Sequence, residues 1–185
     1  MEERKLKEIL RIIFLDIDGV LNHELFYRDR YEGKNDAKSR EYPLSEIDFV
    51  SVGYLNQLVL DTGAKVVISS TWRSGRSTEE LQDILNQAGF VGEVIDKTPS
   101  LRNLGDAVLR GNEIYKWLKD NEEVYGSKYH SYNNYVIFDD DSDMLYWQRN
   151  NFFLVDRYAG LSPNICYRAK KVLMGDLYNR EAYEL

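Results

Sequence analysis

The fold of this chain is decided by the stretch RIIFLDIDGVLN, residues 11–22. Its first five residues form a nearly continuous apolar run that is rich in β-branched and aromatic side chains and too short for a helix. Such a run is typical of a strand that is buried on both faces of a sheet. Two carboxylates, Asp16 and Asp18, follow with one apolar residue between them, and Gly19 permits a turn at once. We therefore expect both carboxylates to converge just beyond the strand.

Two carboxylates held close together repel each other unless a cation or a shared proton relieves the repulsion. Hard divalent cations such as Mg²⁺ prefer oxygen ligands, and a carboxylate can also act as a nucleophile. The pair therefore suits a magnesium site in which one carboxylate attacks a substrate and the other moves a proton.

Length and composition limit the classes of protein that this chain can belong to. The 185 residues are 43% hydrophobic and 30% charged, which is ordinary for a globular protein. This length predicts a single domain over residues 1–185. The net charge of −7 argues against a simple electropositive nucleic-acid binder. The one cysteine, Cys166, excludes an internal disulfide framework, and no segment is apolar for long enough to span a membrane, so we expect a cytoplasmic protein.

Apolar runs alternate with segments of helical spacing along the chain. This alternation predicts βαβ units, a parallel sheet and the α/β fold class. A long polar and aromatic segment, residues 23–43, lacks periodicity and is expected to be a loop, either a functional lid or a surface loop. The predicted strands are 11–15, 65–69, 91–95, 135–138 and 151–155, and the predicted helices are 45–61, 78–88, 109–119 and 165–173.

Reactive polar residues, aspartates or a serine, follow three of the predicted strands, and none of these strands begins with such a residue. The first strand leads to Asp16 and Asp18, the second to Ser70, and the fourth to Asp139 and Asp140. In an open parallel sheet, ligands bind beyond the carboxyl ends of the strands. These side chains are therefore expected to meet at one edge of the sheet.

These motifs and their order resemble the haloacid dehalogenase-like (HAD) phosphohydrolase superfamily. The segment DIDGV after a strand looks like its first motif, VVISS at residues 66–70 like its second, RGNEI at 110–114 like its third, and FDD at 138–140 like its fourth. The second and third segments are most similar to the small HAD branch associated with RNA-repair proteins. The resemblance implies a Rossmannoid three-layer α/β/α fold with a central, mainly parallel sheet and a small flap or cap insertion at about 23–43.

The resemblance and the charges together imply a role for each carboxylate. Asp16 is expected to be the nucleophile that forms an aspartyl-phosphate, and Asp18 the general acid and then base. Asp16, Asp18 through its backbone carbonyl, and Asp139 or Asp140 are expected to hold Mg²⁺. The presence of Asp18 favours a phosphatase, since the related dehalogenases resemble this pattern without that acid.

The phosphoryl oxygens need hydroxyl and guanidinium partners. The resemblance gives this role to Ser70, with its neighbour Thr71, and to Arg110, and we also assign Arg73 to phosphate binding.

Several of these assignments have alternatives. Ser69 competes with Ser70 as the motif hydroxyl, and Lys97 and Arg102 compete with Arg110 as the basic residue. Arg73 could instead pair with a site carboxylate. Asp141 and Asp143 are expected to cap a helix containing residues 144 and 145 and to take no part in the site.

The predicted function is a Mg²⁺-dependent phosphohydrolase acting on a phosphomonoester. The small insertion favours a nucleic-acid terminal phosphate or another phosphorylated macromolecule as substrate, and no membrane partner is expected. One alternative is a phosphotransferase or mutase that uses the same chemistry. Another is a phosphorylatable receiver-like signalling domain, although in such domains the acidic pair precedes a lone phosphoacceptor and a lysine follows late in the chain.

Overall fold

A five-stranded sheet forms the centre of the molecule, and every pairing in it is parallel. The computed structural model describes residues 10–31, 46–101, 108–122 and 134–175. The spatial order of the strands is β3-β2-β1-β4-β5, which places β1 in the middle. The strands are β1 (Ile12–Leu15), β2 (Lys65–Ile68), β3 (Val94–Lys97), β4 (Tyr135–Asp139) and β5 (Phe152–Leu154).

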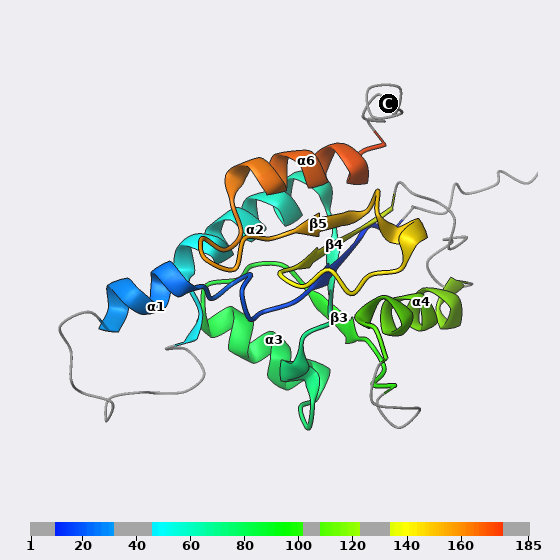
Figure 1. The fold of residues 1–185 in the computed structure, drawn as a ribbon, viewed down its shortest axis with the longest axis horizontal. Coiled ribbons are helices and arrows are strands. Elements are labelled where there is room, and N and C mark those ends of the chain that lie inside the picture. Colours follow the sequence, from blue (N-terminus) through cyan, green and yellow to red (C-terminus); the bar gives the residue numbers. More distant parts are fainter. Residues whose placement is uncertain (1–9, 32–45, 102–107, 123–133, 176–185) are drawn as a thin grey trace, which may run out of the picture.

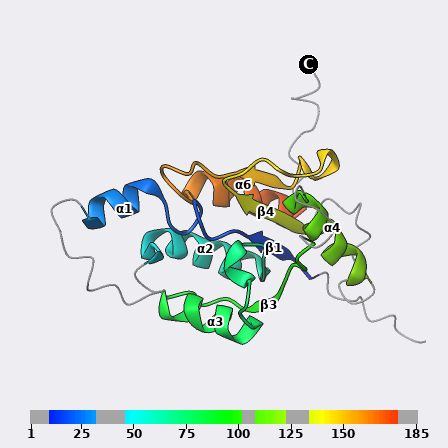
Figure 2. The ribbon, with the colours of Figure 1, turned by 60° about the horizontal axis from the view of Figure 1, so that its bottom comes forward.

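Helices cover both faces of this sheet, as Figures 1 and 2 show. Side chains of α2, α3 and α6 share one buried apolar cluster with alternate residues of β1, β2 and β4. Side chains of α4 pack on the other face, where Phe14 of β1 meets Trp117 edge-on. The helices are α1 (Glu24–Tyr31), α2 (Phe49–Thr62), α3 (Thr78–Gln87), α4 (Arg110–Asp120) and α6 (Pro163–Leu173). The predicted three-layer α/β/α arrangement is thereby confirmed.

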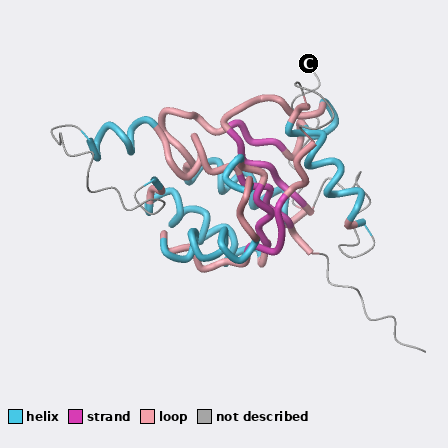
Figure 3. The backbone as a smooth tube through the Cα atoms, turned by 90° about the horizontal axis from the view of Figure 1, so that it is seen from below, coloured by secondary structure: helices cyan, strands magenta, loops and turns pink. Residues whose placement is uncertain are grey.

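The register of the strands decides which residues share the carboxyl-end edge. Leu15 pairs with Ile68 on one side and with Phe138 on the other. The residues that follow these three, Asp16, Ser69 and Asp139, therefore lie at the same level at the carboxyl-end edge. Figure 3 shows the strands running side by side through the middle of the molecule, with the helices around them.

Local signals predict most helix boundaries closely. Ser77 caps α3 through a capping box with Glu80, and Gly63 ends α2 with a positive φ of 67°. The third strand lies later than predicted, at 94–97 in place of 91–95. Asp96 and Lys97 are half-buried in this edge strand, and both have partners there: Asp96 accepts from the indole of Trp117, and Lys97 donates to backbone carbonyls.

The prediction of a loop over residues 23–43 is wrong for its first part. Residues 24–31 form α1, and residues 32–43 lie outside the described ranges. The helix carries no apolar stripe, so periodicity could not reveal it. It is anchored instead by its backbone, because the amides of Glu24 and Leu25 donate to the carbonyls of Arg157 and Tyr158.

Among the helices of the described ranges, none combines the length and the apolar character that a membrane crossing requires.

Candidate active site

Three acidic side chains meet where β1 and β4 end. Asp16, Asp139 and Asp140 each offer a carboxylate oxygen, and these oxygens lie within 4.8 Å of one another. Asp16 is 5% exposed and Asp139 is fully buried. The sheet therefore brings together the carboxylates of the first and the last motif, as the sequence predicted.

Arg110 balances part of this negative charge. It is the first residue of α4, and its Nη1 lies 3.2 Å from Oδ1 of Asp16 while its Nε lies 3.2 Å from Oδ2 of Asp139. Nη1 also donates to the backbone carbonyl of Ser69 at 2.7 Å. The structure thus places Arg110 in the cluster, whereas Lys97 donates to backbone carbonyls of the β2–α3 loop and Arg102 lies outside the described residues.

Burial and mutual repulsion govern the protonation of the carboxylates. Burial raises the pKa of Asp139 to about 8, with a further contribution from the charge of Asp16 and only partial relief from Arg110. Burial also raises the pKa of Asp16, against the opposing effects of Arg110 and of a hydrogen bond from Ser70. Burial alone would lower the pKa of Arg110, but the charges of Asp16 and Asp139 more than offset this and raise it. One guanidinium is therefore too little positive charge for this cluster.

The hydroxyl of Ser70 reaches the cluster, whereas that of Ser69 does not. Ser70 is buried at the end of β2 and hydrogen-bonds to the carboxylate of Asp16. The Ser69 hydroxyl is buried and has no hydrogen-bond partner among the described residues. Thr71 is exposed and begins the 3₁₀ helix η2 (Thr71–Arg73) next to Ser70. Of the two serines, Ser70 is thus the one placed to face a group bound at Asp16.

Asp18 stands at the rim of the cluster. It is exposed, and the indole Nε1 of Trp72 lies 3.1 and 3.0 Å from its two carboxylate oxygens. The side-chain amide of Asn22 donates to its Oδ1 at 2.9 Å. Its carboxylate does not belong to the group of three that could hold a cation, so of the two carboxylates in the first motif, which were expected to converge, only that of Asp16 joins this group; metal binding by the backbone carbonyl of Asp18 stays a prediction.

Arg73 does not enter the cluster, and we withdraw its assignment to phosphate binding. Its guanidinium is 8% exposed; Nε donates to the carbonyl of Thr98 at 3.1 Å, and Nη1 donates to the carbonyls of Ser69 and Ser70 at 2.6 and 2.7 Å. Nη2 forms a buried ion pair with Glu113 of α4, so its acidic partner is not a site carboxylate. Arg73 therefore stabilises the chain just after β2 by hydrogen-bonding to its backbone carbonyls.

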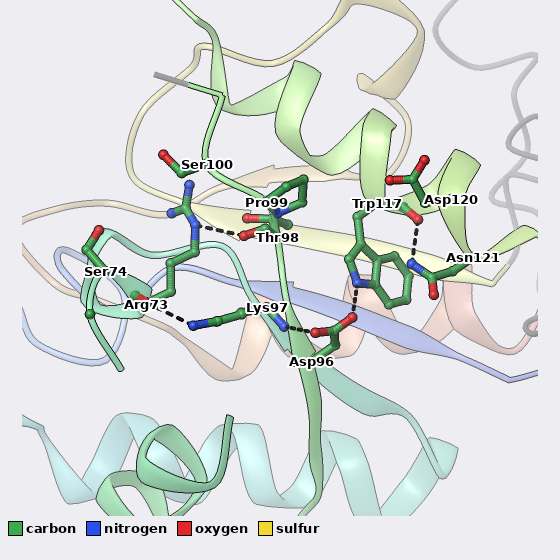
Figure 4. Close-up of a pocket in the computed structure, with 11 residues that line it drawn as sticks. Arg73, Ser74, Asp96, Lys97, Thr98, Pro99, Ser100, Trp117, Asp120 and Asn121 are labelled. Atoms are coloured by element: carbon green, nitrogen blue, oxygen red, sulfur yellow. Dashed lines mark hydrogen bonds between the residues drawn. The ribbon is translucent and has the colours of Figure 1, made fainter. Parts of the chain in front are cut away.

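A cavity of about 450 Å³ beside Arg73 is distinct from the carboxylate cluster. Figure 4 shows Arg73 turned toward Thr98 there, with Trp117 bonded to Asp96 on the opposite side. Of the residues considered for the site, Arg73 and the alternative basic residue Lys97 line this cavity.

Asp140 is held in place by two residues that sequence reasoning did not assign to the site. Its Oδ2 accepts a hydrogen bond of 2.8 Å from Nε of Arg157, in the loop between β5 and α6. It also packs against Gly19, whose φ is +74° and where an added Cβ would lie 2.3 Å from Oδ2 of Asp140. The glycine was expected to serve a turn, but its second role is to leave room for this carboxylate. No sequence pattern pointed to Arg157.

The predicted capping of a helix by Asp141 and Asp143 is wrong. Residues 144 and 145 are not helical, and the 3₁₀ helix η4 (Tyr146–Gln148) begins without a side-chain cap hydrogen bond. Oδ2 of Asp143 accepts a hydrogen bond from the backbone amide of Arg110 at 2.8 Å, while Oδ1 is buried without a partner among the described residues. Asp143 thus caps α4 across the chain and fixes the start of the helix that carries Arg110.

The residues fit a divalent cation. Oδ2 of Asp139 is buried and lacks a hydrogen bond from any described residue, although the Arg110 guanidinium lies near it. A buried carboxylate oxygen without a donor is costly, and together with the carboxylates of Asp16 and Asp140 it forms an oxygen-rich ligand set. Asp16, Asp139 and Asp140 could hold the ion.

Comparison with known proteins agrees with this geometry. A family model described as the HAD domain in Swiss Army Knife RNA repair proteins matches residues 12–165, which include all the motifs of the site. No curated protein and no solved structure matches the chain.

Substitution Gly19→Ala should weaken divalent-cation binding, because the new methyl group would displace Asp140. The matched control is Gly75→Ala, where φ is +72° but no heavy atom lies within 4 Å of the added Cβ. We expect the control to lose about 1 kcal/mol of stability from backbone strain alone. Gly19→Ala should lose more stability, and calorimetric titration with divalent cations should show weaker binding than in the unaltered chain. Equal stability losses with unchanged cation affinity would contradict the assigned contact.

The stability of the metal-free protein should fall as the pH rises toward 8. Unfolded Asp139 titrates near 3.8, whereas the folded protein holds the proton until about pH 8. The stabilisation is therefore complete below the lower value and is lost as the pH approaches the upper one, by up to about 1 kcal/mol per pH unit. Denaturant titrations with a chelator present, from about pH 5 to 8, should show this slope, and Asp139→Asn should reduce it to the part that the raised pKa of Asp16 contributes. The exposed Asp141→Asn serves as control and should leave the slope unchanged.

Proposed function

The chain belongs to the HAD domains of Swiss Army Knife RNA repair proteins, and on that premise we propose that it is a divalent-metal-dependent phosphohydrolase with Asp16 as the nucleophile. The observation that carries the proposal is the position of Asp16, between the guanidinium of Arg110, the hydroxyl of Ser70 and the carboxylates of Asp139 and Asp140. A phosphoryl group bound against Asp16 would meet a cationic group, a hydroxyl and a metal ligand set at once.

The first chemical step transfers the phosphoryl group to the protein. An oxygen of Asp16 attacks phosphorus, the bond to the leaving oxygen breaks, and a proton from Asp18 passes to that oxygen. Arg110 and Ser70 hold the negative phosphoryl oxygens while the charge moves. The product of this step is an aspartyl-phosphate on Asp16.

The second step releases phosphate. Asp18, now ionised, takes a proton from water, the water oxygen bonds to phosphorus, and the bond to Asp16 breaks. An exposed carboxylate at the rim suits this role, because water can reach it as soon as the leaving group departs.

Mg²⁺ is the proposed cation, held by Asp16, Asp139 and Asp140 together with the backbone carbonyl of Asp18. When bound, it neutralises negative charge on the phosphoryl oxygens and on the carboxylates. The raised pKa of Asp139 supports this, because a buried carboxylate that resists ionisation alone is stabilised as a ligand of a divalent cation.

The terminal phosphate of a nucleic acid is the proposed substrate. Support comes from the family description, which refers to RNA repair, and from the short connections between the site motifs. The segment between β1 and α2, residues 16–48, is too short to form a large cap domain, so a macromolecular end could reach the cluster. Transfer of the phosphoryl group to an alcohol in place of water would use the same residues, and phosphate release measured with and without an alcohol acceptor separates the two outcomes.

Asp16→Asn should abolish Mg²⁺-dependent hydrolysis of an aryl phosphate. Loss of the nucleophile is expected to lower kcat by at least about a thousandfold. Asp141→Asn, which removes an exposed carboxylate from the neighbouring loop, should retain activity within about twofold, as expected for an exposed group outside the reacting atoms. Substantial turnover by Asp16→Asn would overturn the assignment of the nucleophile.

A further inference from the structure

In the described structure the carboxylate of Asp18 accepts hydrogen bonds from the nearby amide of Asn22 and from the indole of Trp72, a residue of η2 that is distant in the sequence. The indole Nε1 lies 3.1 Å from Oδ1 and 3.0 Å from Oδ2, so the N–H points between the two oxygens. An indole N–H can only donate a hydrogen bond, so this contact favours the orientation in which both carboxylate oxygens point toward the indole. An exposed aspartate without such a donor would sample several rotamers in solvent.

Trp72 is itself rigidly held. Its side chain is 8% exposed and belongs to the large apolar cluster under the sheet. The Arg76 guanidinium lies over its ring at 5.8 Å and donates to its carbonyl at 2.9 Å. Its backbone amide donates to Oγ of Ser70 at 3.3 Å. The segment η2 therefore contains Trp72, which holds the proposed acid Asp18, and it directly follows Ser70, whose hydroxyl faces Asp16.

We propose that Trp72 is a positioning residue that fixes the carboxylate of Asp18 for proton transfer, an inference that rests on the proposed function of Asp18. The indole acts through Asp18 and does not touch the reacting atoms. Asn22 also donates to Asp18, but its own Oδ1 accepts from the amide of Gly19, so its replacement would disturb the loop as well. Trp72→Phe removes the donor and retains a ring in the core.

The dependence on the leaving group separates positioning of an acid from a general loss of structure. An alkoxide leaves with difficulty and needs a proton in the transition state, whereas an aryloxide with electron-withdrawing groups leaves without one. A defect confined to the acid must therefore be large for alkyl phosphates and small for activated aryl phosphates. A defect in folding or in phosphate binding must affect both alike.

The experiment measures kcat/KM of the full chain with Mg²⁺ for a nucleoside monophosphate and for p-nitrophenyl phosphate, because kcat/KM reports formation of the aspartyl-phosphate and not its later hydrolysis, which is common to both substrates. For Trp72→Phe we expect kcat/KM to fall about tenfold or more with the nucleotide and less than about threefold with the aryl ester. The matched control is Trp117→Phe, which removes an indole N–H that donates at 2.7 Å to Asp96, an aspartate outside the cluster. In the control, any loss of kcat/KM should be the same for the nucleotide and for the aryl ester.

Two results would overturn the proposal: equal losses on both substrates in Trp72→Phe, or no loss on either. Asp18→Asn distinguishes a failure of this inference from a failure of the proposed function. If Asp18→Asn shows the strong leaving-group dependence and Trp72→Phe does not, Asp18 is the acid and Trp72 merely packs. If Asp18→Asn shows no dependence, Asp18 is not the acid, and the proposed mechanism fails with this inference.

A second observation, independent of the first, concerns a row of side chains that leads outward from Asp140. Arg157 contacts Asp140, its neighbour Tyr158 is 46% exposed, and Arg28 of α1 donates to Oη of Tyr158 at 2.8 Å while its guanidinium lies 5.9 Å from the ring centre. Figure 1 shows α1 projecting beyond the carboxyl-end edge of the sheet, beside the β5–α6 loop. The row therefore alternates guanidinium, aromatic ring and guanidinium from the cluster toward solvent.

We propose that this row, Arg157, Tyr158 and Arg28, binds the single strand that carries the terminal phosphate, which again rests on the proposed function. Cations that alternate with an exposed ring suit the phosphates and the base of a nucleic-acid strand. The acidic residues nearby do not prevent this. The exposed Asp29 pairs loosely with Arg28 at 3.3 Å, and Asp156 accepts the amide of Tyr158 within its own turn.

The test compares a phosphorylated RNA oligonucleotide with p-nitrophenyl phosphate as substrates of the double variant Arg28→Ala/Tyr158→Ala. Arg157 is left intact because it touches Asp140. We expect KM for the oligonucleotide to rise about tenfold, as the loss of one stacked base predicts, with a weaker salt dependence. The control, Arg168→Ala/Tyr167→Ala, removes an exposed pair from α6 and should leave KM unchanged. An unaltered oligonucleotide KM in the double variant would refute the row while leaving the phosphatase assignment standing.

Discussion

The structure depends on one electrostatic constraint: two buried carboxylates, Asp16 and Asp139, share a single guanidinium, that of Arg110. Burying like charges side by side is costly, and one cation relieves only part of the repulsion. The remaining excess of negative charge appears as a raised pKa at both aspartates. A protein that keeps such a cluster at neutral pH has a place for a further cation, which a divalent metal ion would fill.

The neighbouring elements serve this arrangement. Asp143 accepts a hydrogen bond from the first amide of α4 and so fixes the position of Arg110. Arg73 donates hydrogen bonds to the carbonyls of Ser69 and Ser70. The carbonyl of Ser69 accepts from both arginines, at 2.6 Å from Arg73 and 2.7 Å from Arg110. The two guanidiniums therefore join the end of β2 to α4. Arginine suits this task because its planar fork of donors binds several oxygens at once and retains its charge when buried.

Sequence reasoning succeeded where chemistry and local pattern coincide. Short apolar runs that end in Asp16, Ser70 and Asp139 predicted strand ends of one sense, and the parallel register places them at one edge. It failed where a role depends on a partner distant in the sequence. Arg73 resembled a substrate ligand because it follows the serine motif, yet its guanidinium forms an ion pair with Glu113, forty residues later. Arg157 carried no signal, because only the fold brings the β5–α6 loop to Asp140.

The sequence by itself determined the fold class, the order of the motifs and the strand ends at which the clustered carboxylates lie, because strand periodicity, glycine turns and acidic strand ends are local properties of the chain. The tertiary structure alone decided the division of labour among the arginines, the capping of α4 by Asp143 and the contact of Trp72 with Asp18. These depend on which side chains the packing of distant segments brings within a few ångströms. Charge and hydrogen-bonding capacity can be read from a residue, whereas the partner that satisfies them is set only when the chain folds.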